Sequence, residues 1–240
     1  MFKGPLYKLM RVINPITNKI FFYEKNWISR WNKLGINDGV NARLGGLNFA
    51  ECIIYSLNFG DIQSKSWDNS FELLLGACES LKKTGIESIV LCANTAHLFA
   101  DRLQDTIGLP IIHIVEETAK AVNKKGYKKV GLLGTKYTME MNFYRNKLEK
   151  YGLEVLIPEK QETKDYIQRT LKEELGIGFI NPETKTNYIS IVKELADCGA
   201  ECIILGCTEI PMLISQEDLS IHVFDTTRIH CQAIVDYIVY

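Results

Sequence analysis

Residues 85–97 read GIESIVLCANTAH, and residues 199–211 read GAECIILGCTEIP. Each segment begins with glycine, continues through an acidic residue into an apolar run, and ends in a polar turn. The preceding residues also match at this offset of 114 positions, where CESLKKTG aligns with VKELADCG. A helix, a glycine, a buried strand and a turn therefore occur twice, which indicates two related lobes of alternating helices and strands.

The same alternation runs from about residue 50 to the end of the chain. Short apolar runs predict buried strands at ECIIYSL, SIVLCA, IIHIV, KVGLLGT, LEVLIP, CIILGCT and IHVFD. Amphipathic segments between these runs predict helices that end at glycines before the next strand. We expect an α/β fold of two similar Rossmann-like lobes, with mainly parallel sheets and pseudo-two-fold symmetry. The N-terminal lobe would comprise 1–108 and 222–240, and the C-terminal lobe 109–221.

Composition excludes several classes of protein. The chain has 240 residues, 46% of them apolar, and a net charge of −1, so no basic surface for nucleic acid or membrane phosphate is expected. No apolar run is long enough to span a bilayer, and we predict no signal peptide. The seven cysteines are irregularly spaced without a CxxC pair, which predicts no disulfide framework, no metal site and a reduced cytoplasmic compartment.

Cys207 is the candidate catalytic residue because it follows the second repeated strand, aligned with Ala93 in the first. Backbone N–H groups at such a turn would lower its pKa from about 8.5 towards neutrality, giving a thiolate that acts as a base or nucleophile. Glu209 would raise that pKa instead, so we do not assign it as an activator. The alternative is an inert buried thiol, which we expect of Cys52, Cys78, Cys198, Cys202 and Cys231.

The turns CANTAH and GCTEI together resemble the paired signatures of the aspartate/glutamate racemase superfamily, the cofactor-independent amino-acid racemases. The segments around 37–62, 132–158 and 223–237 are also similar to the broad-specificity branch, which includes L-aspartate/glutamate racemases. The resemblance covers about residues 37–240. It implies a substrate held between two lobes, with one proton removed and another returned on opposite faces of the α-carbon, and no pyridoxal phosphate.

The resemblance also implies a set of substrate-binding residues, namely Asn94, Thr95, Thr135, Thr138, Lys164 and Thr208. Thr135 would offer a hydroxyl and backbone N–H groups to a carboxylate, or else serve as a simple helix N-cap. Lys164 would pair with the substrate's carboxylate, or else lie solvated at the start of a helix. The implied partner is a small amino acid, without a cofactor, metal, nucleic acid or membrane, and a homodimer is common in the family.

The sequence departs from the family at Ala93, where many members have cysteine and some have threonine. Alanine carries no exchangeable proton, and Cys92 should face the other way because strand neighbours alternate. Cys207 is then the main acid/base, and Thr95 or an ordered water would exchange the proton on the second face of the substrate's α-carbon. The alternatives are one-sided chemistry, such as exchange or decarboxylation, and a weak or inactive relative that binds a small carboxylate.

Residues 1–36 are the second departure, since the family opens with a strand and a Gly-rich turn that this segment lacks. KIFFY at 19–23 predicts a strand, but the following EKNWISRWNK lacks the glycines that would let a ligand approach the backbone. The abrupt change near Asn37 suggests a shifted upstream reading frame. Translation of the upstream DNA in the other two frames tests this hypothesis.

Three histidines accompany these elements. His97 ends the first turn and would orient it or pack at the start of a helix. His113 lies in the apolar run IIHIV, which predicts a satisfied core histidine. His230 lies near the start of the last helix, where Asp225 and Thr226 are predicted to cap.

Overall fold

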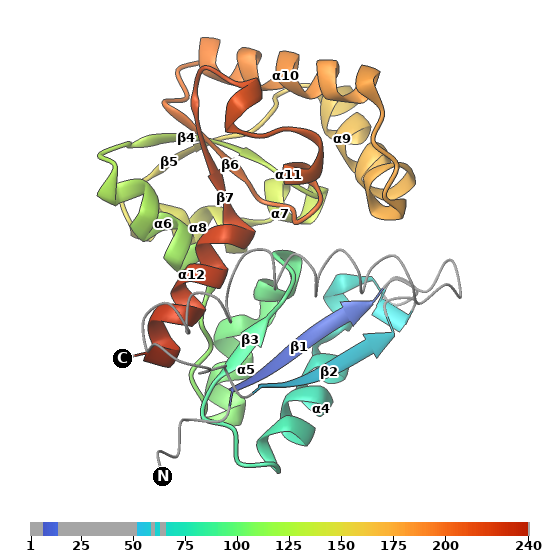
Figure 1. The fold of residues 1–240 in the computed structure, drawn as a ribbon, viewed down its shortest axis with the longest axis vertical. Helices are drawn as coiled ribbons and strands as arrows, with labels where there is room; N and C mark the ends of the chain where they lie inside the picture. Colours follow the sequence, from blue (N-terminus) through green and yellow to red (C-terminus); the bar gives the residue numbers. More distant parts are fainter. Residues whose placement is uncertain (1–6, 14–51, 59–60, 63–65, 240) are drawn as a thin grey trace, which may run out of the picture. The chain divides into compact units, whose positions relative to one another are not determined.

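The computed structural model describes residues 7–13, 52–58, 61–62 and 66–239. The chain forms two compact units (Figure 1). The first comprises the described residues up to His113 together with those from His230 onward, and the second comprises Ile114–Ile229. Among the described residues, no helix has the length and apolar composition needed to cross a bilayer.

The first unit contains a parallel sheet in the order β2-β1-β3. β1 pairs in parallel with β2 on one side and with β3 on the other, and Ile111 adds a single parallel bridge to Ile89 of β3. The described elements are β1 (Tyr7–Ile13), β2 (Cys52–Asn58), η1 (Trp67–Asn69), α4 (Phe71–Lys82), β3 (Ile89–Leu91), η2 (Thr95–Phe99) and α5 (Ala100–Ile107).

The second unit contains a parallel sheet in the order β5-β4-β6-β7. Its elements are α6 (Ile114–Lys124), β4 (Lys129–Leu133), α7 (Lys136–Glu140), α8 (Asn142–Lys150), β5 (Glu154–Leu156), α9 (Gln161–Glu173), η3 (Leu175–Ile177), α10 (Pro182–Asp197), β6 (Cys202–Leu205), α11 (Ile210–Leu213), η4 (Gln216–Asp218) and β7 (His222–Asp225). The last helix, α12 (Thr226–Val239), follows.

The predicted α/β fold with parallel sheets is confirmed, and the sequence repeat has a structural counterpart. β6 residues 203–205 lie 114 positions after β3, and each of these strands pairs with the first strand of its own sheet. The helices before them end at Gly85 and Gly199, whose φ angles of 78° and 97° place both glycines in the left-handed region. Helix, glycine, strand and turn therefore recur in three dimensions.

The predicted strands differ from the observed strands in two details. The run IIHIV was predicted as a strand, but only Ile111 pairs, and α6 begins at Ile114. The run was misleading because its last two residues begin the buried face of a helix, Ile114, Val115, Thr118, Ala119 and Val122. The strand predicted at 19–23 lies outside the described residues, and β1 was not predicted.

Alternating side chains of each sheet pack on opposite helical layers. In the second unit, Leu133 and Ile203 pack with residues of α9 and α10, whereas Leu132 and Ile204 pack with residues of α6 and α8. In the first unit, Ile89 and Leu91 face the core formed with α4 and α5. The sheet of the second unit is therefore covered on both faces, as is usual for parallel sheets. In the first unit β2 is largely exposed, with Ile53 and Ile54 among its exposed side chains.

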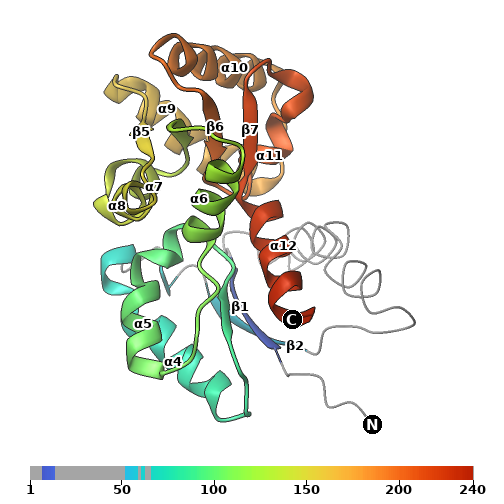
Figure 2. The same cartoon turned by 90° about the vertical axis from the view of Figure 1, so that its left-hand side faces the viewer.

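Helix α12 belongs to both units, since its first residues lie in the second and those from His230 onward in the first. Figure 2 shows it as one continuous helix from the end of β7 to the C-terminus. Its second half packs Cys231, Ile234 and Val235 against Val90 and Ile112. The C-terminal residues thereby cover the face of β3 opposite α4 and α5.

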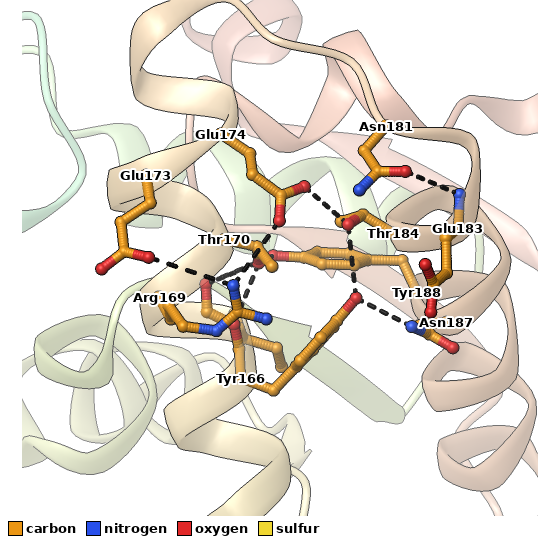
Figure 3. Close-up of polar contacts among 11 residues, drawn as sticks. Tyr166, Arg169, Thr170, Glu173, Glu174, Asn181, Glu183, Thr184, Asn187 and Tyr188 are labelled. Atoms are coloured by element: carbon orange, nitrogen blue, oxygen red, sulfur yellow. Dashed lines mark hydrogen bonds and ion pairs between the residues drawn. The ribbon is translucent and has the colours of Figure 1, made fainter.

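A polar network joins α9 to α10 in the second unit (Figure 3). Asn187 donates to the Tyr166 hydroxyl at 2.8 Å, which donates to Thr184 at 3.3 Å. Thr184 in turn donates to Glu174 Oε2 at 2.6 Å. Because each hydroxyl both accepts and donates, the chain of bonds runs in one direction and ends on a carboxylate, which should fix α9 against α10.

Thr184→Val should destabilise the second unit by about 1–3 kcal/mol, because it keeps the shape but leaves Tyr166 without this acceptor and Glu174 without this donor. The urea midpoint measures the effect. Thr186→Val is the matched control, since Thr186 lies on the same helix in an exposed position. Equal midpoints for the two variants would show that the network contributes nothing.

Candidate active site

The turn after β6 holds Cys207, and Gly206 determines its position. The Gly206 N–H donates to the Leu133 carbonyl at 2.6 Å, which ties the ends of β6 and β4 together. A Cβ at Gly206 would lie 3.0 Å from that carbonyl oxygen and 3.0 Å from Thr138 Cγ2. A larger residue would therefore push the turn away from β4, so glycine is what lets the two strand ends meet.

The Cys207 side chain is largely buried, with 8% of its surface exposed. It lies on the α9 and α10 side of the sheet and packs in the core that contains Ile210 and Leu213. Its Sγ donates a hydrogen bond to Glu209 Oε2 at 2.9 Å. The Thr208 hydroxyl donates to the same oxygen at 2.8 Å. One carboxylate oxygen thus accepts from two neighbouring side chains.

The pKa of Cys207 lies well above its usual value, mainly because burial disfavours the thiolate and then because the Glu209 carboxylate repels it. The backbone N–H groups of Glu209 and Thr208 lower the pKa, as the sequence analysis expected, but their effect is smaller. The predicted shift towards neutrality is therefore wrong. The group is a thiol at rest, with its proton directed at Glu209.

Thr135 and Thr138 lie in the turn after β4. Thr135 is the N-cap of α7 and accepts from the Thr138 N–H at 3.2 Å. The two hydroxyl oxygens are 3.1 Å apart, and Thr138 is fully buried. The helix-capping role expected as the alternative for Thr135 is present. Because Thr138 also contacts Gly206, these threonines lie beside the Cys207 turn at the carboxyl ends of β4 and β6.

Lys164 is neither solvated nor free. Its side chain is 14% exposed, and its Nζ lies 3.0 Å from Glu140 Oε1 at the end of α7. This partner could not be predicted, because nothing in the spacing of residues 140 and 164 indicates that α7 and α9 meet. The Lys164 ammonium has three N–H donors, so it can bind an anion beside Glu140.

Asn94 and Thr95 lie in the first unit after β3, Asn94 as the N-cap of η2 and Thr95 as its first residue, and both are buried. Ala93 packs with the α4 and α5 core, on the same side as Ile89 and Leu91. Cys92 packs instead with Val90 and α12. Cys92 therefore faces away from Ala93, as strand alternation predicts, and its thiol does not stand in for the missing group.

Comparisons with protein families, curated proteins and solved structures relate the chain to known proteins. Residues 55–234 match the family described as Asp/Glu/Hydantoin racemase. The broad specificity amino-acid racemase RacX of Bacillus subtilis is 27% identical over an alignment that covers 67% of this chain and 68% of RacX.

Solved structures match over nearly the whole length. The crystal structure of a putative Asp/Glu racemase from Yersinia pestis is 38% identical with a TM-score of 0.83, covering 98% of this chain and 100% of that one. PH1733, an aspartate racemase homologue from Pyrococcus horikoshii OT3, is 31% identical with a TM-score of 0.77, covering 98% and 99%.

Proposed function

The chain belongs to the Asp/Glu/hydantoin racemase family, and on this premise we propose that it removes and returns the α-proton of a small amino acid, aspartate or glutamate, without a cofactor. Cys207 is the acid/base. The observation that carries the proposal is the hydrogen bond from its Sγ to Glu209 Oε2, because it gives the thiol a defined acceptor for its proton.

In the proposed step, the S–H bond of Cys207 breaks and an O–H bond forms on Glu209. The thiolate then takes the substrate's α-proton, and the electron pair remains on the α-carbon and delocalises into the substrate's carboxylate. Donors on that carboxylate stabilise the negative charge as it develops. We assign this role to Thr135, Thr138 and Thr208, with Lys164 contributing beside its ion pair with Glu140.

The amino group and the second face of the α-carbon are assigned to the turn of residues 93–97. Asn94 holds the substrate, and the Thr95 hydroxyl or a water beside it supplies the second proton. A neutral hydroxyl is a weaker acid than a thiol. Return of a proton to the second face should therefore be slower than removal by Cys207.

Ala93 favours a second candidate function, exchange of the α-proton without inversion. An inactive relative that only binds a small carboxylate would instead be stabilised by ligand without exchange. A homodimer and a cytoplasmic location stay predictions.

A panel of L- and D-amino acids in heavy water distinguishes these functions. Mass spectrometry measures deuterium at the α-carbon, and chiral chromatography measures inversion. We expect deuterium to enter aspartate or glutamate faster than the enantiomer appears. If no amino acid in the panel acquires deuterium, the proposal of proton chemistry is wrong.

Glu209→Gln should change two properties in opposite directions. Removing the carboxylate should lower the pKa of Cys207, because the charge that repels the thiolate is gone. It should also slow α-proton exchange about tenfold, because the proton acceptor is lost. Thiolate absorbance in the ultraviolet, taken as the difference from a Cys207→Ala variant, gives the pKa.

The control for this prediction is Glu217→Gln, which removes an exposed carboxylate from the same unit. It should change neither property. A thiol that ionises at higher pH in Glu209→Gln, or an unchanged exchange rate, would remove Glu209 from the proposed step.

A further inference from the structure

Three of the chain's four histidines form a buried cluster in the first unit. His97, His113 and His230 are 3%, 6% and 3% exposed. The His97 ring centroid lies 4.8 Å from that of His113 and 5.6 Å from that of His230. His97 is therefore the central ring of the cluster.

The cluster joins three separate parts of the chain. His97 lies in η2, two residues after Thr95. His113 is the last residue before the chain enters the second unit, and His230 is the first residue after it returns. The turn proposed to bind substrate is thus packed against both points where the chain passes between units.

Hydrogen bonds fix which nitrogen carries the proton on two of these rings. His97 Nδ1 lies 2.9 Å from the Ala93 carbonyl oxygen, and His230 Nε2 lies 2.7 Å from that of Ile112. A carbonyl only accepts, so each of these nitrogens must donate. As neutral rings, His97 is the Nδ1–H tautomer and His230 the Nε2–H tautomer.

We propose that His97 and His230 are positioning residues: as neutral rings of opposite tautomer, they hold the turn of residues 93–97 and the segment before α6 in place for substrate. The positioning role rests on the proposed function, since it assumes that the turn binds substrate. The tautomers do not depend on it.

The electrostatic surroundings support neutral rings. Burial holds the pKa of His97 well below its usual value, and His113 and His230 lower it further. Burial also lowers the pKa of His230 to about 4, with a smaller contribution from His113. The carbonyls of Ala93 and Ile112 act in the opposite direction on His97. Among the described residues, the Coulombic contributions on the two rings come from the other histidines of the cluster, so protonation would place like charges side by side.

The first test needs no variant and no substrate. Long-range ¹⁵N–¹H spectra of histidine-labelled protein distinguish Nδ1–H from Nε2–H rings and report protonation. We expect His97 as Nδ1–H and His230 as Nε2–H, both still neutral at pH 5. The opposite tautomer on either ring, or protonation with a midpoint near the unperturbed value of about 6.5, overturns the inference.

The second test uses pairs of variants that differ only in how far the side-chain amide extends from the backbone. An Asn amide reaches as far as Nδ1, and a Gln amide as far as Nε2. His97→Asn and His230→Gln should therefore keep the carbonyl bond and retain α-proton exchange. His97→Gln and His230→Asn should lose about tenfold or more in exchange rate, the cost of one buried hydrogen bond. His222→Gln, in the second unit, controls for loss of a histidine elsewhere.

The two tests separate failure of this inference from failure of the proposed function. Equal exchange rates for the Asn and Gln variants at each position would exclude the positioning role. If neither the wild type nor any variant exchanges the α-proton, the proposed function is wrong and the positioning role is wrong with it. The tautomers are still tested by the spectra alone.

Discussion

Cys207→Ala should lower the rate of α-proton exchange by about 10²–10⁴-fold, the usual contribution of a positioned general acid/base. The thiol is the group directed at Glu209, and alanine leaves nothing there to accept the α-proton. Deuterium incorporation in heavy water measures the loss. The loss should be largest for the enantiomer whose α-hydrogen faces Cys207, because the turn of residues 93–97 is assigned to the opposite face.

The matched control is Cys198→Ala, which removes an exposed thiol at the end of α10 in the same unit. It should leave exchange unchanged. Far-ultraviolet circular dichroism and the urea midpoint establish that the Cys207→Ala protein is folded. A folded Cys207→Ala protein that still exchanges at the wild-type rate would overturn the assignment of Cys207.

Ala93→Cys should raise the rate of inversion relative to exchange by about 10²–10⁴-fold, because it adds an acid/base where the wild type has none. Ala93 is only half-buried, and the change adds a single sulfur atom to its side chain. Ala93→Thr should produce a smaller gain, since a hydroxyl is a weaker acid than a thiol. The ratio of enantiomer formed to deuterium incorporated reports the effect.

Cys92→Ala is the control for this second prediction. Its thiol packs with Val90 and α12, so its loss should leave the ratio unchanged. If Ala93→Cys exchanges as the wild type does but inverts no faster, residue 93 does not face the α-carbon, and the alignment of Ala93 with Cys207 has no catalytic meaning.

The fold was largely predictable because its signals are local. Short apolar runs between helical segments predicted β2 to β7, and the repeat predicted that β3 and β6 hold equivalent places in two sheets. The strand predicted at IIHIV was wrong because so short a run, four apolar residues and one histidine, fits a strand or the start of a buried helix equally well. β1 carries no glycine-bounded alternation that would single it out.

The site was predictable only in part, because its energetics depend on contacts between distant residues. The position of Cys207 after a strand followed from the repeat, but its raised pKa comes from burial that no sequence pattern reports. Lys164 meets Glu140 only because α7 lies beside α9. The local sequence around each of the three histidines does not show that they are neighbours. Their clustering depends on where the chain crosses between the units.

The course of α12 has a consequence for synthesis on the ribosome. Cys231, Ile234 and Val235 complete the core beside Val90 and Ile112, yet they are translated after the whole of the second unit. Most multidomain chains mature from the N-terminus as they emerge. Here the second unit is fully synthesised while the first still lacks one wall of its core. The half that is made first should therefore be the last to mature, since its core is completed only when residues 231–235 have left the ribosome.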